Sequence, residues 1–252
     1  MTVPATGLFV APCSREAALV AVRCWHYSRT LPSGRCLYWG IWFDGVFIGV
    51  VVVSRGSCQH IGTALHLRQD QVAEVTRIAL TPDHVPPVSQ VLAVVVRLLK
   101  KANPGLVALV SYADSREHHD GRGVYGGAGW IYLGPTHKEA TLWLHGKEVH
   151  ARTVSSKFKT RSLRWLQANV DPNATRIINP VKHKWALGLT PVMRERLAVM
   201  AQSNPTRDGG VASAHAGRNA GCLLPSVAGS TREETGAIPD PVAPFVHEAA
   251  HV

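Results

Sequence analysis

The chain has 252 residues, 46% of them apolar and 17% charged, and its 27 Lys and Arg against 17 Asp and Glu give a formal net charge of +10. This composition excludes a disordered polyelectrolyte and allows one large globular domain or two small ones. A surplus carried by so few charged residues must be concentrated, which indicates an anionic partner.

The apolar runs and the cysteines exclude further classes. The longest β-branched run, residues 46–53, is far shorter than the roughly 20 residues of a membrane-spanning helix, so no membrane association is expected. The first 14 residues lack the basic and apolar parts of a secretory signal, which predicts a cytoplasmic protein. Five cysteines without a CxxC pair exclude a paired disulfide framework and a thiolate zinc site of the usual spacing.

Strand and helix signals alternate from the N-terminus. The apolar run at 7–13 predicts a strand, and Ser14 is a candidate N-cap for a helix that reaches Cys24. The β-branched and aromatic runs at 35–43 and 46–54 flank Asp44-Gly45, which predicts a hairpin with a two-residue turn. A third strand follows at 72–80.

The middle of the chain contains the clearest helix signal. Apolar residues recur at helical spacing over 89–101, and Asn103-Pro104-Gly105 ends the helix. The near-continuous apolar run at 106–114 predicts a central strand buried on both faces. A polar loop, a short helical stretch at 124–128 and strands at 130–134 and 141–146 complete this part.

This order predicts an α/β fold, a mixed central sheet with flanking helices in which a crossover helix links a parallel pair of strands. The order is similar to that of the GNAT acyltransferases. Residues 152–184 hold eight Lys and Arg and one acid, a net charge of +7, whereas residues 202–252 hold three basic and five acidic residues and are rich in Gly, Pro and Ser. The aromatic residues Phe158, Trp165 and Trp185 interleaved with these charges are typical of nucleic-acid contacts. We therefore expect a GNAT-like catalytic domain at 1–150, a basic DNA-binding extension packed on it at 151–201, and a flexible, disordered tail at 202–252.

Two segments carry chemically capable residues near predicted strand or helix ends. Residues 25–28, Trp-His-Tyr-Ser, follow the first helix, where His26 either interacts with the helix dipole or takes part in a site. In the third strand, alternation puts Glu74 and Thr76 on one face and Val75 and Arg77 on the other. Arg77 then either pairs with an acid or clamps an anionic substrate.

Two further segments follow the central strand. Ser111-Tyr112-Ala113-Asp114 ends it, and ligands bind at the carboxyl ends of parallel strands, so Asp114 is a candidate base or metal ligand unless it only caps the following loop. The Gly-rich stretch from His118 and His119 onwards presents Tyr125 at the turn into the next strand.

These motifs in this order, followed by His150-Ala151-Arg152-Thr153-Val154-Ser155-Ser156-Lys157 and a basic segment, resemble the Mom family over roughly residues 20–200. The founder of that family is the DNA-modification protein of bacteriophage Mu, a distant GNAT relative. The resemblance implies an enzyme of the host-cell cytoplasm that converts adenine in duplex phage DNA to an N6-carbamoylmethyl derivative and so protects it from restriction. Double-stranded DNA is then the partner, with tRNA as a second candidate.

The resemblance also implies roles for particular residues. The catalytic candidates are His26, Tyr27, Arg77, Ser111, Asp114 and Tyr125, with Asp114 and Tyr125 for proton transfer. The candidates for contacts with the substrate or the DNA are Trp25, Ser28, Arg152, Lys157, Lys159, Arg161, Arg164, Lys182 and Lys184. His26, Tyr27 and Asp114 are in addition a candidate iron site.

The chain differs from most GNAT proteins in the loop that would bind the acyl donor. These cradle the pyrophosphate of coenzyme A with glycine-rich backbone amides, but residues 81–89 contain three prolines and no glycine. A glycine-derived donor such as glycyl-tRNA is therefore favoured over acetyl-coenzyme A. Two alternatives stay open: a GNAT-type N-acetyltransferase that uses acetyl-coenzyme A on a protein or small amine, and a DNA-binding protein without catalysis.

Overall fold

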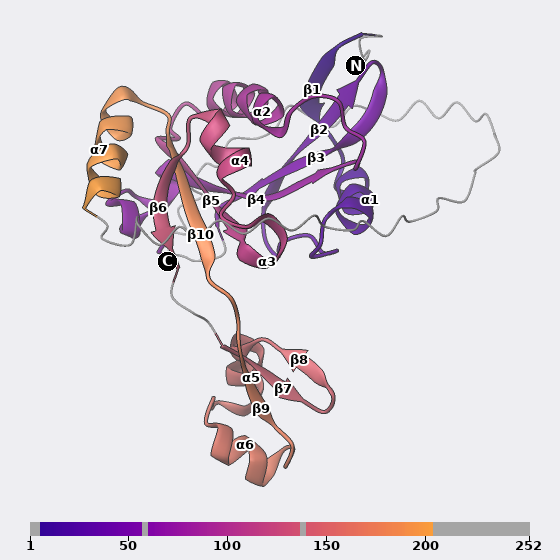
Figure 1. The fold of residues 1–252 in the computed structure, drawn as a ribbon, viewed down its shortest axis with the longest axis vertical. Helices are drawn as coiled ribbons and strands as arrows, with labels where there is room; N and C mark the ends of the chain where they lie inside the picture. Colours follow the sequence, from indigo (N-terminus) through magenta and orange to yellow (C-terminus); the bar gives the residue numbers. More distant parts are fainter. Residues whose placement is uncertain (1–5, 57–59, 137–139, 204–252) are drawn as a thin grey trace, which may run out of the picture.

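A seven-stranded mixed sheet with the order β1-β2-β3-β4-β5-β10-β6 forms the main body in the computed structural model, which describes residues 6–56, 60–136 and 140–203 (Figure 1). Its strands are β1 (Leu8–Pro12), β2 (Cys36–Phe43), β3 (Val46–Ser54), β4 (Val72–Leu80), β5 (Ala108–Asp114), β6 (Ile131–Pro135) and β10 (Lys182–Gly188). Its helices are α1 (Arg15–Trp25), α2 (Val88–Ala102), α3 (Ser115–His118), α4 (Arg122–Tyr125) and α7 (Pro191–Gln202). The predicted α/β fold with a mixed sheet and flanking helices is confirmed.

Local sequence signals explain the first elements. The Ser14 side chain accepts a hydrogen bond from the Ala17 amide at 3.2 Å and so caps α1, as predicted. Asp44 and Gly45 have φ angles of 48° and 79°, the left-handed conformation that a two-residue hairpin turn requires at both positions. The predicted hairpin is therefore confirmed as β2–β3.

The parallel pair is formed by β4 and β5, with α2 as the crossover helix between them. Pairing runs from Val72 opposite Ala108 to Val75 opposite Ser111 and ends there. Both strands continue, β4 to Leu80 and β5 to Asp114, so they separate towards their carboxyl ends.

Helices cover both faces of the main sheet. Val51 and Val53 of β3 are fully buried in the core that includes α2, whereas Val50 and Val52 are fully buried in the core that includes α1. A third core forms where α7 packs on β10 and β6, and it includes residues of β5. Because consecutive residues of β3 face different helices, this strand is a continuous apolar run without an exposed face.

A β-bulge in β4 changes the alternation that the sequence predicts. Val53 lies opposite Val75 but Val52 lies opposite Arg77, so Thr76 is the additional residue. Arg77 consequently shares the α1 face with Ala79, and not the face of Val75 as predicted. The extra residue reverses the pattern for the remainder of the strand.

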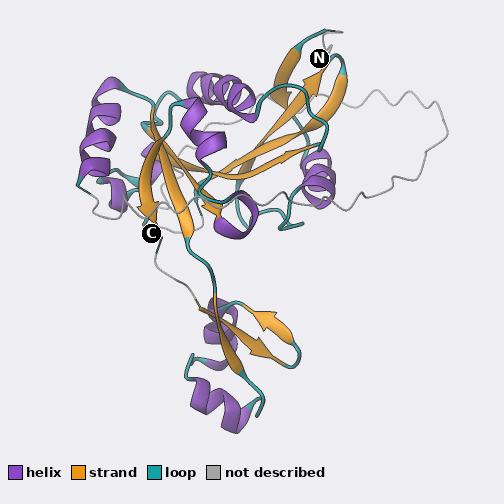
Figure 2. Cartoon of the chain, viewed as in Figure 1, coloured by secondary structure: helices purple, strands orange, loops and turns teal. Residues whose placement is uncertain are grey.

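A second, smaller unit stands apart from the main body (Figure 2). It consists of β7 (Ala140–Leu144), β8 (Lys147–Val149), α5 (Ala151–Phe158), α6 (Leu163–Asn169) and β9 (Thr175–Ile178), with the sheet order β8-β7-β9. Its own buried core contains Leu142, Leu144, Val154, Leu166 and Ala174. We refer to residues 140–178 as the small unit.

The small unit lies across the domain boundary that the sequence predicts. The strand predicted at 141–146 belongs to β7 and not to the main sheet, and the boundary predicted at residue 150 falls between β8 and α5. After the small unit, the chain re-enters the main sheet as β10, which lies between β5 and β6. Helix α7 packs on β10. The charge surplus therefore marks a segment that crosses from one unit to the other.

The remaining expectations for this region concern the tail and the membrane. Apart from Gln202 and Ser203, the tail predicted at 202–252 lies outside the described residues. Within the described residues, no helix is long and apolar enough to cross a bilayer.

Candidate functional site

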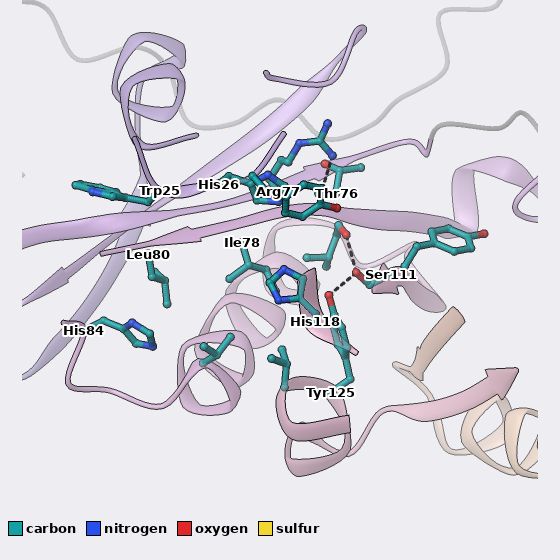
Figure 3. Close-up of a pocket in the computed structure, with 15 residues that line it drawn as sticks. Trp25, His26, Thr76, Arg77, Ile78, Leu80, His84, Ser111, His118 and Tyr125 are labelled. Atoms are coloured by element: carbon teal, nitrogen blue, oxygen red, sulfur yellow. Dashed lines mark hydrogen bonds between the residues drawn. The ribbon is translucent and has the colours of Figure 1, made fainter. Parts of the chain in front are cut away.

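A cavity of about 250 Å³ opens where β4 and β5 separate (Figure 3). We call it the β4–β5 pocket. Six of the residues predicted for the site line it: Trp25, His26, Tyr27, Arg77, Ser111 and Tyr125. The other lining residues are Val75, Thr76, Ile78, Leu80, His84, Val88, Tyr112, His118 and Val124. Motifs more than 90 residues apart in sequence thus meet at one place.

His26 ends α1 and has only 7% of its surface exposed. Its Nδ1 accepts a hydrogen bond from the Ser28 amide at 3.1 Å and lies 2.8 Å from the Ser28 hydroxyl. Since an amide N–H can only donate, Nδ1 carries a lone pair, and the proton of the neutral ring lies on Nε2. Burial, together with the positive charges of Arg77 and His118, lowers the pKa of His26 to about 3. His26 is therefore a neutral hydrogen-bond donor at physiological pH.

The ring of Tyr27 packs against the rings of His26 and His118. Its ring stacks on His26 with centroids 4.3 Å apart and meets His118 edge-on at 5.7 Å. Although Tyr27 is 44% exposed, the surrounding protein raises its pKa, first through desolvation and then through the charge of Asp114. The phenol is therefore protonated at neutral pH.

Arg77 reaches the pocket because the β4 bulge turns it towards the end of α1. Among the described residues its hydrogen bonds go to two main-chain carbonyls, from Nε to Thr30 at 3.1 Å and from Nη1 to Thr76 at 2.6 Å. Burial lowers the pKa of Arg77, and the charges of Tyr27 and Glu74 oppose that effect. The carbonyls fix the guanidinium plane without neutralising it, so Arg77 can bind an anion or a polarised carbonyl.

Ser111 and Tyr125 form a directed hydrogen-bond chain. The Ser111 hydroxyl donates to the Val75 carbonyl at 2.8 Å, and the Tyr125 hydroxyl lies 2.7 Å from Ser111 Oγ. Because serine has one hydroxyl proton, Tyr125 is the donor in the second bond. Burial raises the pKa of Tyr125 to about 12.

Asp114 lies beside the pocket but is not among its lining residues. Its Oδ1 accepts a hydrogen bond from the Arg116 amide at 3.0 Å and caps α3, the local role that the sequence allowed as an alternative. Of the two adjacent histidines that the sequence singled out, His118 lines the pocket, and burial lowers its pKa.

The predicted metal ligands do not fit a metal site in this arrangement. A metal-bound histidine donates its second N–H to an acceptor, whereas the Nδ1 of His26 faces the donor N–H of Ser28, and its Nε2 carries a proton. Asp114 is engaged in capping α3. Leaving tyrosine aside, no group of three His, Cys, Asp or Glu in the described ranges is arranged to hold an ion.

The remaining predicted residues divide between the two units. Ser28 does not line the pocket, but its hydroxyl lies within hydrogen-bond distance of His26 Nδ1. The basic residues on the small unit are exposed: Arg152, Lys157, Lys159, Arg161 and Arg164. Lys182 and Lys184 belong to β10, and burial lowers the pKa of Lys184.

One lining residue, His84, is absent from the residues that the sequence predicts. It lies in the loop between β4 and α2, and its Nδ1 is 2.7 Å from the Thr81 carbonyl oxygen. The available signal was its place just after the carboxyl end of a parallel strand. Residues 81–89 were considered only as a phosphate-binding loop, for which prolines are unsuitable.

The pocket, with its aromatic, imidazole and guanidinium groups, lies at the carboxyl ends of a parallel pair, where α/β proteins bind their ligands. A model described as the Mom protein family matches residues 7–206, which is 200 of the 252 residues, and the chain belongs to this family. No curated protein matches the chain. Membership confirms the predicted resemblance and indicates a phage DNA-modification protein with a transferase-type activity and DNA as its substrate.

Proposed function

We propose that the protein transfers a glycine-derived group to the N6 amine of adenine in DNA and leaves an N6-carbamoylmethyl group that protects the DNA from restriction. The observation that carries this proposal is the convergence in the β4–β5 pocket of His26, Tyr27, Arg77, Ser111 and Tyr125, the residues that underlie the family resemblance. The mixed sheet with a parallel pair and crossover helix is consistent with a GNAT-like acyl-transfer scaffold.

Atom balance supports a glycyl ester, such as glycyl-tRNA, as the donor. The adenine amine loses a proton and attacks the glycyl carbonyl, the ester C–O bond breaks, and the alcohol leaves with a proton. The resulting N6-glycyl adenine is an isomer of the N6-carbamoylmethyl product. Attack of the glycyl amine on C6 through a five-membered ring, with the former N6 leaving as the carboxamide nitrogen, converts one into the other without a further reactant.

The pocket supplies groups for the acyl-transfer step. The Tyr125 phenol keeps its proton and donates it in a hydrogen bond to Ser111. Because it is a weak acid, it is suited to protonate a strongly basic leaving alkoxide. The N–H of His26 and the guanidinium of Arg77 are donors for the charge that develops on the carbonyl oxygen. Trp25 and Tyr27 offer aromatic faces for an adenine flipped out of the duplex.

The small unit is the proposed DNA-binding part. Both of its connections leave the main sheet at the edge where β5 ends, since Lys182 lies opposite Asp114 and Pro135 lies opposite His183. Cations that contact phosphates bind DNA without reading sequence. Trp165 is 42% exposed, and its ring centroid lies 6.3 Å from that of Phe158, so it adds an aromatic surface next to these cations. This placement supports the proposal that DNA bound by the small unit lies near the pocket.

Nucleoside mass spectrometry of DNA from cells that express the protein tests the proposed modification. The expected result is an adenine nucleoside heavier by one carbamoylmethyl group, whose formation is lost with Tyr125→Phe and kept with Tyr38→Phe, a tyrosine outside the pocket. In vitro, glycyl-tRNA labelled with ¹⁵N in glycine should place the label on the nitrogen attached to C6. Modification with acetyl-coenzyme A alone would instead establish the acetyltransferase alternative.

DNA binding by the small unit has a separate test. The double variant Arg161→Gln/Arg164→Gln should weaken binding to duplexes of any sequence and reduce the slope of log affinity against log salt by about 1 per lost phosphate contact. Arg97→Gln/Arg196→Gln removes the same charge from exposed positions on α2 and α7 and serves as the control. Equal losses in the two double variants would show that net charge alone, and not the small unit, determines binding.

A further inference from the structure

The β4–β5 pocket contains two imidazoles whose tautomers are fixed in opposite ways by the backbone. His26 Nδ1 receives the Ser28 N–H, which puts the proton of its neutral ring on Nε2. His84 Nδ1 lies 2.7 Å from the Thr81 carbonyl oxygen, which can only accept, so its proton is on Nδ1 and Nε2 has a free lone pair. The free nitrogen of His26, Nε2, is therefore a hydrogen-bond donor, and the free nitrogen of His84, also Nε2, is an acceptor.

We propose that His84 is the general base that takes the proton from the attacking adenine amine, an inference that rests on the proposed function. Histidine is the side chain that most often fills this role, and an exocyclic amine must lose a proton as it forms the new bond. The N6 proton moves to Nε2 of His84, the nitrogen lone pair forms the bond to the glycyl carbon, and the alkoxide that leaves takes the proton of Tyr125. Proton exchange with solvent then restores both residues.

Other polar groups at the pocket are engaged in ways that do not suit proton removal. The phenol proton of Tyr125 is directed at Ser111, and burial raises the pKa of that phenol to about 12, so it is protonated at neutral pH. Arg77 is a cation, and Asp114 is not among the residues that line the pocket. The remaining rival is His118, whose tautomer no hydrogen bond among the described residues fixes.

The position of His84 matches a base that acts apart from the acid. Figure 3 shows His84 and the Ser111–Tyr125 pair at different ends of the pocket, with Ile78 and His118 between them. A glycyl ester placed between the two ends would receive the amine from one side and release its alcohol towards the other. This separation keeps the base from taking the proton that the acid must deliver.

The loop that holds His84 is built to be rigid. The Thr81 amide donates to the Ile48 carbonyl at 2.9 Å, and the Thr81 carbonyl accepts the His84 amide at 3.2 Å, which closes a turn. Prolines at 82, 86 and 87 restrict the remaining backbone, and Pro87 is the N-cap of α2. The prolines that make this loop unsuitable for a pyrophosphate thus fit it to hold one imidazole in place.

The test compares His84→Asn, His118→Asn and His66→Asn. An Asn amide at 84 can still donate to Thr81 but has no basic nitrogen, and His66 is exposed in the left-handed conformation that Asn tolerates, so His66→Asn is the control. With glycyl-tRNA and a DNA duplex, we expect the single-turnover rate to fall about 10²–10⁴-fold for His84→Asn, with unchanged DNA affinity. Added imidazole should restore part of the rate in His84→Ala, which a structural role would not produce.

The outcomes separate the inference from the proposed function. If the wild-type chain forms no modified nucleoside, the proposed function fails and His84 loses its assignment with it. If the wild type is active and His84→Asn keeps its rate, or if only His118→Asn loses it, the proposed function stands and the assignment of His84 is overturned. A ¹⁵N NMR spectrum of the histidine rings gives an answer without activity, because a proton on Nε2 of His84 would also overturn it.

Discussion

Burial at the end of α1 determines the protonation of His26. The ring is 7% exposed, and its Nδ1 already accepts the Ser28 amide, so a second proton has no place to bind without breaking that bond. The folded protein therefore binds this proton only near pH 3, whereas an unfolded chain binds it near the ordinary value of 6.5. Folding and protonation of His26 oppose each other between these two values.

This difference predicts how stability depends on pH. The contribution of neutral His26 is fully present above pH 6.5 and is lost as the pH falls towards 3, because the unfolded chain binds the extra proton first. Urea unfolding at a series of pH values should show a free energy of unfolding that falls with acidification, with a share from His26 of at most about 1.4 kcal/mol per pH unit. His26→Gln should have the shallower slope. Equal slopes would mean that His26 is protonated alike in the folded and unfolded chains.

Sequence reasoning identified six of the fifteen residues that line the pocket, but not their protonation states. Trp25 and His26 were singled out at the end of a predicted helix, Arg77 within a predicted strand and Tyr125 in a Gly-rich stretch, and these residues line the pocket. The tautomer of His26 depends on where the Ser28 amide points, which a sequence does not encode locally. His84 was missed because only the backbone of its loop was considered.

Tyr125 is positioned by the turn between α3 and α4, in which Gly121 has a φ of 75°. A Cβ at this position would lie 2.6 Å from the Ala113 Cβ and 3.0 Å from Tyr125 Cδ2. The turn thus needs glycine for both its conformation and its space, and it places the ring of Tyr125 against Trp185 at 5.8 Å between centroids.

Gly121→Ala should therefore destabilise the protein by about 2 kcal/mol or more and move the Tyr125 hydroxyl away from Ser111. Thermal unfolding and the modification assay measure the two effects. Gly123→Ala is the matched control, because it lies within α4 with open space around its Cβ, and it should be neutral or stabilising by up to about 1 kcal/mol. Equal stability of the two variants would contradict the assigned role of Gly121.

The elements with local signals were predicted well. The α2 helix, the β2–β3 hairpin and the parallel pair follow from periodicity, a two-residue turn and a crossover helix, and all three are confirmed. The bulge at Thr76 was not predicted, because it depends on how β4 aligns with β3 and leaves the local sequence pattern unchanged. This one residue decides that Arg77 faces α1.

At the scale of the whole molecule, the small unit is an insertion between two neighbouring strands of the main sheet. The Thr136 amide donates to the Lys182 carbonyl at 2.7 Å, and the Lys182 amide donates to Thr136 Oγ1 at 3.1 Å, so the points of exit and return lie side by side. The sequence did not indicate this because the basic segment continues across the return point into β10. Strand pairing in the main sheet, and not composition, defines the boundary.

This arrangement predicts that the main body folds without the small unit. Replacing residues 137–181 by Asn-Gly would close β6 and β10 as a hairpin and remove eight basic and three acidic residues. The shortened chain should unfold cooperatively, keep the Tyr125 phenol with a pKa of about 12 in a spectrophotometric titration, and lose most of its affinity for DNA. Loss of cooperative unfolding would show that the main sheet depends on the small unit.

The adjacency of Thr136 and Lys182 also bears on how such proteins diversify. An insertion whose two ends meet can be lengthened, replaced or exchanged between lineages at one hydrogen-bonded junction, while the sheet that carries the pocket is inherited unchanged. Under the proposed function, the affinity for DNA and the chemistry performed on it would then evolve on separate stretches of the gene.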